Sequence, residues 1–335
     1  MNIYDISEKA GVSIATVSRV INGSSRVSPK TRERVLTVME QHGYVPNAFA
    51  RGLGLKSMKT IGLLCPNAAD PYLAQAITYL ERAFRANAYD CLLSCTGKAL
   101  GDRQKGVELL LSKHVDGMVL MGSTFVEDTD AGNAYLQNAA QHVPLVMLNA
   151  AYTYDNIFCV VCDDYRATMD ATQYLLDVGR KSILYLYHSR NISGQKKLAG
   201  YKAGLASRGV PVREDLIHFF TEDKMSVPAV RDFILSLAEG GLEFDAVLTS
   251  EDVLSVGAAK YARIAKRRVP DSLAIVGYNN SSFCLCCEPE LTSVDNKLET
   301  LCNNCVHTML NVLTGQEAPQ KTVYNAELVR RGSTP

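Results

Sequence analysis

The chain has 335 residues, of which 47% are hydrophobic and 21% charged, and its 35 basic residues balance its 35 acidic ones. This length is enough for two or three packed domains. No apolar run approaches the roughly 18–20 residues that cross a membrane, and the N-terminus lacks a signal peptide's apolar core. These features argue against a membrane or secreted protein, and we expect a cytoplasmic one.

The zero net charge hides an uneven distribution. Residues 1–59 carry nine basic and four acidic side chains, a net charge of +5, whereas the other 276 residues carry 26 basic and 31 acidic ones, a net charge of −5. A basic segment on an acidic body indicates that a polyanion binds at the N-terminus. The ten cysteines are scattered, and a reducing compartment would keep them as thiols.

The first 22 residues predict two short helices joined by a tight turn. Ile3, Ile6 and Ala10 have helical spacing, and Gly11 ends this helix because glycine turns at little steric cost. Ser13 stands at an N-cap position before the second helix. That second helix has a buried stripe formed by Val17, Val20 and Ile21.

The opposite face of the second helix has the side chains that a helix in a DNA major groove needs. They are small, hydroxyl, amide or guanidinium groups: Ile14, Ala15, Thr16, Ser18, Arg19 and Asn22. Hydroxyls of this kind contact phosphates, and a few side chains reach base edges. On this pattern alone, an ordinary pair of surface helices is the alternative. A third helix is predicted to start at Pro29, with Ser28 before it.

Three motifs in the first 55 residues are similar to those of a known protein family. They are Gly-Val-Ser-x-x-Thr-Val-Ser-Arg-Val-Ile-Asn-Gly at 11–23, Arg-Val-Ser-Pro-Lys-Thr-Arg-Glu-Arg-Val at 26–35 and Gly-Tyr-Val-Pro-Asn at 43–47. This stretch resembles the DNA-binding headpiece of the LacI/GalR family of bacterial repressors. The resemblance implies that Ile14 and Ala15 read bases, and as apolar groups they are expected to contact thymine methyls. Arg19 is expected to make the polar base contact, and the remaining headpiece contacts are expected from Tyr4, Ser13, Thr16, Ser18, Asn22 and Ser28.

Residues 46–55, Pro-Asn-Ala-Phe-Ala-Arg-Gly-Leu-Gly-Leu, are similar to the hinge helix of the same family. The resemblance implies that the hinge folds on DNA, that Leu53 enters the minor groove as an apolar wedge, and that Asn47 and Ala50 also contact DNA. Without DNA the segment is a linker. Gly52 and Gly54 disfavour a helix, and a segment of this length is too short to be helical alone in water.

From residue 60 the pattern changes to short apolar strands separated by amphipathic helices. Strands are predicted at 61–65, 90–95, 117–121, 145–148, 183–186, 216–219, 246–248 and 274–277, with helices that include 72–88, 101–113 and 132–141. Strands buried on both faces, with helices between them, indicate parallel sheets and right-handed βαβ units. We therefore predict a two-lobed α/β body of two doubly wound sheets, as in periplasmic sugar-binding proteins, behind an all-α helix–turn–helix headpiece.

The predicted domains follow from these patterns and from family landmarks such as Asp163-Asp164 and Val276-Gly277-Tyr278-Asn279. The headpiece covers 1–46, the hinge and linker 47–59, and the effector-binding and dimerisation body 60–335. Within the body, the N-lobe is expected at about 60–160 and 292–320, and the C-lobe at about 161–291 and 321–331.

The resemblance places a small polar effector in the cleft between the lobes. Where relatives hold sugar hydroxyls with an arginine, an aspartate and an asparagine, this chain has Lys197, Asn279 and Glu251. Lysine loses the planar two-point grip of arginine. Asn149 is a further polar candidate for contact with the effector. Tyr72 and Leu73 match residues that form an apolar or aromatic wall of the cleft, and Phe220 is a looser candidate for a second wall. Lys197 and Glu251 balance in charge, so we expect a neutral polyhydroxy ligand rather than an anion.

Metal and enzyme chemistry receive little support. Cys302 and Cys305 have the spacing of a zinc-ligand pair, but 298–313 predicts a helix, and Cys159 and Cys162 on a strand would point to opposite faces. The chain shows no nucleophile–base arrangement and no phosphate-binding glycine loop, so we expect no enzyme, no metal and no cofactor.

These observations predict a sequence-specific transcriptional regulator, expected to be a repressor, that binds a palindromic double-stranded DNA operator as a homodimer. A small polar, sugar-like effector would control it from the interlobe cleft. Because three cleft positions differ from the family pattern, control by a protein partner without a small effector is the alternative. A solute-binding protein would share the body but not the basic headpiece.

Overall fold

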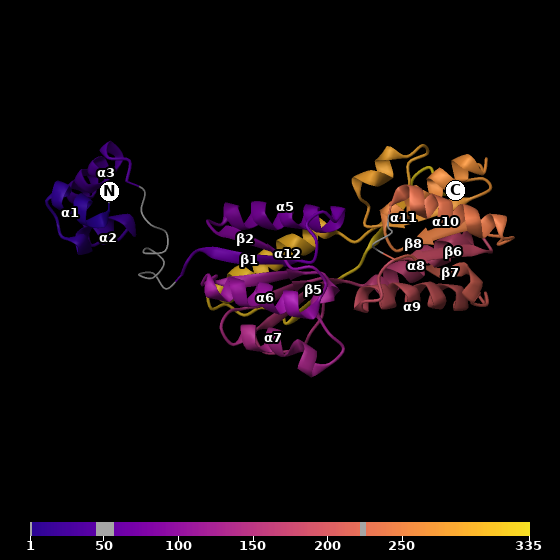
Figure 1. Ribbon diagram of the computed structural model, residues 1–335, viewed down its shortest axis with the longest axis horizontal. Helices are drawn as coiled ribbons and strands as arrows, with labels where there is room; N and C mark the ends of the chain where they lie inside the picture. Colours follow the sequence, from indigo (N-terminus) through magenta and orange to yellow (C-terminus); the bar gives the residue numbers. More distant parts are fainter. Residues whose placement is uncertain (1, 45–56, 222–225) are drawn as a thin grey trace.

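The computed structural model describes residues 2–44, 57–221 and 226–335 (Figure 1). The expected hinge contacts Asn47, Ala50 and Leu53 lie outside the described residues. Within the described residues, no helix is both long and apolar enough to cross a membrane.

The headpiece contains the predicted helices α1 (Ile3–Ala10), α2 (Ile14–Ile21) and α3 (Pro29–Gln41). Gly11 ends α1 in the left-handed region with φ of 61°, where glycine has no steric penalty. Ser13 and Ser28 are the N-caps of α2 and α3, and each side-chain oxygen accepts a backbone N–H at 3.2 Å. The headpiece has its own core, formed by Ile6, Ala10, Val17, Val20, Val35 and Met39.

The first lobe is built on a six-stranded parallel sheet in the order β11-β5-β4-β3-β1-β2. Its strands are β1 (Thr60–Cys65), β2 (Asp90–Cys95), β3 (Gly117–Met121), β4 (Leu145–Leu148), β5 (Ile157–Cys162) and β11 (Lys321–Tyr324). One face packs on α5 (Pro71–Ala86) and α12 (Leu298–Leu313), and the other on α6 (Leu100–Ser112) and α7 (Asp130–Ala140) (Figure 1).

The second lobe repeats this plan in the order β12-β10-β9-β8-β6-β7, with β12 antiparallel to β10. Its strands are β6 (Ile183–Tyr187), β7 (Ile217–Phe219), β8 (Ala246–Thr249), β9 (Ala274–Tyr278), β10 (Thr292–Asp295) and β12 (Glu327–Val329). The helices α8 (Asp164–Asp177) and α9 (Ile192–Ala206) cover one face, while α10 (Val227–Glu239) and α11 (Asp252–Ile264) cover the other. The predicted headpiece and two-lobed α/β body are therefore both present.

The expected lobe boundaries are wrong at two places. Residues 292–295 form β10, which pairs with β9 in the second sheet, although 292–320 was assigned to the N-lobe. Residues 321–324 form β11, which pairs with β5 in the first sheet, although 321–331 was assigned to the C-lobe. The chain thus crosses between the lobes after β5, β10 and β11. A short strand's sheet is decided by its distant pairing partner, which the local sequence does not reveal.

Two predictions about local burial have different outcomes. Cys159 and Cys162 of β5 pack in the cores on opposite faces of the sheet, as expected from strand alternation. The apolar run 90–95 is expected to be buried, but β2 is an edge strand that, among the described strands, pairs only with β1, and Leu92 and Leu93 are 39% and 46% exposed.

Candidate functional site

The DNA-facing candidates lie on one exposed helix and at the ends of its neighbours. Ile14, Ala15 and Arg19 are exposed on α2, and Tyr4 is exposed in the first turn of α1. Ile14 is a large apolar side chain that the headpiece core does not use. An exposed apolar group and an exposed guanidinium on the same helix fit a helix that reads base edges.

The candidate polar contacts are partly committed to the headpiece itself. The hydroxyls of Ser13 and Thr16 lie 2.9 Å apart, as do those of Ser28 and Thr31. Asn22 ends α2, where its side-chain amide donates to Ser18 at 3.4 Å. The capping hydroxyls hold α2 and α3 in place, and the remaining free N–H groups of each first turn favour an anion such as a phosphate.

A cavity between the two lobes collects six of the seven effector candidates. Tyr72, Leu73 and Asn149 line it from the first lobe, and Lys197, Glu251 and Asn279 from the second. Loops that follow the carboxyl ends of parallel strands form most of its wall, which is where ligands bind in open α/β sheets.

Phe220, the seventh candidate, is placed differently. It follows β7, and its N–H donates to the carbonyl of Tyr187 at 2.7 Å. Its ring is buried in the core of the second lobe and meets the ring of Phe233 edge-on, with centroids 5.6 Å apart. Alternation along the strand turns Phe220 toward α10. The expectation that Phe220 forms a second wall of the cleft is therefore wrong.

Lys197 is held by uncharged groups of the second lobe. Its Nζ lies 3.7 Å from the centre of the Tyr278 ring and donates to the carbonyl of Ser250 at 3.2 Å. The cation–π contact and the hydrogen bond satisfy the ammonium inside the cleft wall. Asn279 stands at the next position after β9 with φ of 97°, and its side-chain oxygen accepts from Asn296 at 3.1 Å.

Asn149 ties the first-lobe wall together. It has a left-handed backbone with φ of 54°, and its side-chain oxygen accepts the N–H of Cys162 at 3.0 Å. Its side-chain amide donates to the hydroxyl of Tyr72. Burial raises the pKa of the Tyr72 phenol well above its usual range, so this hydroxyl stays neutral.

The carboxylate of Asp164 organises the contact between the lobes. It accepts hydrogen bonds from the hydroxyls of Tyr278 and Ser193, each at 2.6 Å. The N–H of Ser193 in turn donates to the hydroxyl of Ser123 in the first lobe at 3.4 Å. A chain of polar contacts therefore runs from the start of α8 across the cleft to the loop after β3.

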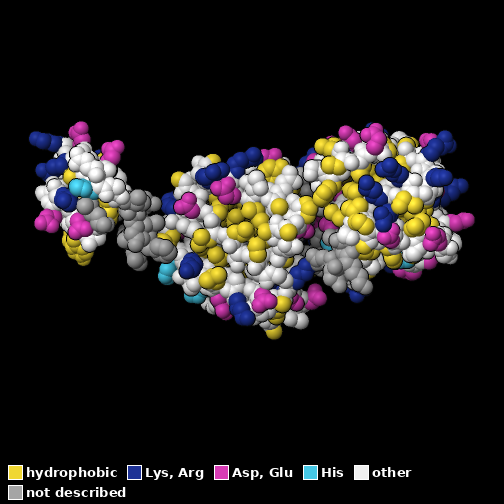
Figure 2. Space-filling model, turned by 45° about the horizontal axis from the view of Figure 1, so that its top comes forward, with side chains coloured by type: hydrophobic (Ala, Val, Ile, Leu, Met, Phe, Trp, Pro, Cys, Tyr) yellow, Lys and Arg dark blue, Asp and Glu magenta, His cyan; other side chains and the backbone are white. Residues whose placement is uncertain are grey.

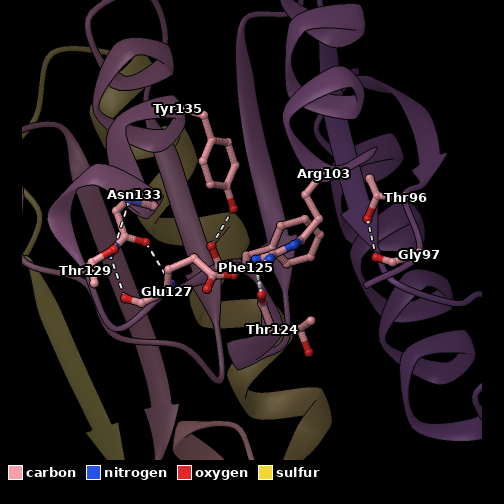
Figure 3. A network of polar contacts seen from close by, with 10 residues as sticks. Thr96, Gly97, Arg103, Thr124, Phe125, Glu127, Thr129, Asn133 and Tyr135 are labelled. Carbon is pink, nitrogen blue, oxygen red and sulfur yellow. Dashed lines mark hydrogen bonds and ion pairs between the residues drawn. The ribbon is translucent and has the colours of Figure 1, made fainter. Parts of the chain in front are cut away.

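A buried arginine supports that loop from behind (Figure 3). Arg103 of α6 is 3% exposed, and it donates to the carbonyl of Thr124 and pairs with the carboxylate of Glu127. The hydroxyl of Tyr135 donates to the carbonyl of Phe125, and Asn133 binds both backbone groups of Glu127 at 2.8 Å. This network fixes the loop whose Ser123 and Thr124 line the cleft.

The cleft also contains residues that the sequence analysis did not select as ligand contacts. Among them are Asp70, Lys98, Ser123, Asp164, His188 and Ser193. Each follows the carboxyl end of a parallel strand, either in the loop or in the first turn of the next helix. The rule that ligands bind at these strand ends could have found them.

Comparison with known proteins agrees with this geometry. The model for bacterial regulatory proteins of the lacI family matches residues 2–47, and the model for a periplasmic binding protein-like domain matches residues 172–334. An HTH-type transcriptional regulator of Lachnoclostridium phytofermentans is 47% identical over 334 residues, which cover 100% of this chain and 99% of that protein.

Two solved structures are similar over the whole chain. The complex of the transcriptional regulator CelR with cellobiose has a TM-score of 0.71 at 26% identity and covers 99% of both chains. The lac repressor dimer bound to operator and the anti-inducer ONPF has a TM-score of 0.88 at 24% identity, covering 100% of this chain and 99% of that one. The expected family is thereby confirmed: this chain belongs to the lacI family of bacterial regulatory proteins and is a DNA-binding transcriptional regulator.

Proposed function

We propose that this regulator is a repressor that binds a palindromic operator as a homodimer and responds to a small, neutral polyhydroxy effector. The observation that carries the proposal is the joint presence of an exposed reading face on α2 and a polar cleft between two lobes. The headpiece supplies the contact with DNA, and the cleft supplies a ligand-sensitive closure of the body.

The operator is tested by selecting sequences from random duplex DNA with the full chain. We expect an enriched site with two-fold symmetry, because a symmetric dimer reads two equal half-sites. A promoter that overlaps this site should lose reporter expression when the chain is present. Enrichment of single, unrepeated half-sites would contradict the dimer, and increased expression would contradict repression.

The exposed edge of the first lobe supports a dimer. Leu92 and Leu93 lie on β2, whose outer edge pairs with no described strand, and hydrophobic side chains gather over the middle of this lobe in Figure 2. Exposed apolar edges of this kind favour association with another chain. Light scattering of the full chain should therefore give twice the mass of one chain.

The effector proposal draws on the chemistry of the cleft. Asn149, Lys197 and Glu251 offer an amide, an ammonium and a carboxyl from both lobes, and the similar CelR structure holds cellobiose. Calorimetry of the full chain with neutral sugars, hexuronates and sugar phosphates tests it. If a hexuronate or sugar phosphate binds tightly and Lys197→Met abolishes this binding, the proposal of a neutral effector is overturned. If no compound binds, control by a protein partner is favoured.

Arg19→Ala should weaken binding to the selected operator by about 1–3 kcal/mol and relax base preference at one position in each half-site. Arg19 is exposed in the last turn of α2. Fluorescence anisotropy with operator and random DNA measures both affinities, and Lys9→Ala on α1 serves as a matched loss of one positive charge. If Arg19→Ala weakens both DNAs equally, Arg19 contacts only phosphate.

The double substitution Gly52→Ala/Gly54→Ala should tighten operator binding several-fold and reduce release by the effector. Each glycine costs a helix about 0.8–1 kcal/mol relative to alanine, so the variant should fold the proposed hinge helix on DNA more easily. Anisotropy with and without effector measures both changes, while effector affinity without DNA should stay the same. If the variant does not bind the operator more tightly, the glycines instead allow the backbone to approach the minor groove closely.

A further inference from the structure

Glu251 brings an acidic side chain into the cleft wall immediately before α11. The side chain is 11% exposed, and its Oε1 atom is buried without a hydrogen-bond partner among the described residues. A buried carboxylate oxygen that accepts no hydrogen bond has lost its hydration without compensation. This oxygen therefore either carries a proton or needs a donor from outside the described residues.

The groups around Glu251 do not fully stabilise its negative charge. Burial is the largest cause that raises its pKa, to about 7, and the charges of Asp70 and Asp252 add to it, while Lys197 and Lys98 lower it. His188 lies with its Nδ1 3.5 Å from Oε1. Burial and the two lysines lower the pKa of His188 to about 4, so it is neutral at pH 7 and supplies no positive charge.

These groups come from both lobes. Asp70 caps α5 and Lys98 follows β2 in the first lobe, whereas His188 follows β6, Lys197 lies on α9 and Asp252 opens α11 in the second lobe. The charge state of Glu251 thus depends on how the two sides of the cleft face one another.

We propose that Glu251 holds a proton in the unliganded cleft and releases it to solvent when a neutral polyhydroxy ligand places its hydroxyl donors against the carboxylate. This inference rests on the proposed function, because it concerns the same cleft. It makes ligand affinity depend on pH, and with it the response of the regulator.

The direction of the linkage follows from hydrogen-bond strength. Hydroxyl donors bind an ionised carboxylate about twice as strongly as a neutral acceptor, so the ligand favours the deprotonated form. Below a pKa of about 7 the ligand has to displace a proton, and above it no proton is displaced. Affinity should therefore be about tenfold lower at pH 6 than at pH 8.

The proton is tested first without a ligand, by thermal unfolding of the full chain between pH 5 and pH 8. A buried acid with a raised pKa stabilises the fold only while it is protonated, and this stabilisation is lost as the pH rises through the raised pKa. Glu251→Gln should therefore raise the melting temperature above that of the wild type by several degrees at pH 8 and by little at pH 5. Glu239→Gln, on the exposed end of α10, is the control, and its melting temperature should differ from that of the wild type by the same amount at pH 5 and at pH 8. If Glu251→Gln changes the melting temperature by the same amount at pH 5 and at pH 8, the proposal is overturned.

The linkage is tested next by calorimetry with cellobiose and a panel of neutral mono- and disaccharides in buffers of different ionisation enthalpy. The wild type should release up to one proton on binding a sugar, and Glu251→Gln should bind it with a pH-independent affinity. Sugar binding without proton release overturns the linkage but leaves the proposed function intact. If no neutral sugar binds the wild type at any pH, the proposed effector class fails, and the melting temperatures still decide the protonation of Glu251.

Discussion

Arg103→Met is expected to lower the stability of the full chain against unfolding by about 2–3 kcal/mol, because it leaves the carbonyl of Thr124 without its donor and removes the partner of the partly exposed Glu127 carboxylate. In the native protein Arg103 is 3% exposed and holds the carbonyl of Thr124 and the carboxylate of Glu127. Methionine fills a similar volume but donates nothing, so the carbonyl loses its donor in a dry site. The midpoint of urea unfolding, followed by circular dichroism, measures the loss.

A surface ion pair provides the control for Arg103. Arg82 and Glu299 pair at 2.5 Å, but their side chains are 59% and 53% exposed. Water and salt screen such a pair, so Arg82→Met should cost less than about 1 kcal/mol. Equal losses in the two variants would mean that the network around Arg103 contributes no more than an exposed contact (Figure 3).

The same network also illustrates what the sequence did not reveal. Residues 101–113 were expected to form an amphipathic helix, and α6 occupies this position. In that pattern a charged side chain is assigned to the solvent face. Arg103 is buried instead, because its partners Thr124 and Glu127 come from a loop beyond the next strand. Burial of this kind depends on tertiary contacts between distant segments.

Local sequence signals, in contrast, were sufficient to predict an element whose start, end and type depend on its own residues. Gly11 and Ser13 bracket the turn between α1 and α2, and the structure has both the left-handed glycine and the N-cap. The runs 117–121 and 145–148 were likewise predictable as strands, because parallel strands buried on both faces are continuously apolar. The sheet to which β10 or β11 belongs, and the side to which Phe220 turns, were not predictable, because pairing and packing partners lie far away in the chain.

Gly194→Ala is expected to disrupt the second-lobe wall of the cleft and to lower stability by about 3 kcal/mol. Gly194 lies in the first turn of α9, where a Cβ atom would be 1.9 Å from the carbonyl oxygen of Ser189 and 2.7 Å from its carbon. Both atoms belong to the backbone, so no side-chain rotation can relieve the overlap. The helix start or the loop before it has to move by about 1 Å to reach an allowed contact.

That displacement directly reaches residues that line the cleft. Asn191, Ser193 and Lys197 lie on or next to the first turns of α9, and all of them line the cavity. Binding groups lose their effect when they stand more than about 0.5 Å from their working positions. The proposed binding of a neutral sugar should therefore weaken by more than tenfold, as measured by calorimetry with the full chain.

Gly101→Ala separates this effect from the general consequence of adding a methyl group to a helix. Gly101 also lies in the first turn of a helix, α6, but a Cβ atom there would meet nothing within 4 Å. Alanine favours the helical state, so this variant should gain up to about 1 kcal/mol in stability and keep its sugar affinity. Opposite signs for the same substitution would assign the loss at Gly194 to the close approach of α9 and the Ser189 loop. A Gly194→Ala chain as stable as the wild type would show that the cleft wall yields at this point without cost.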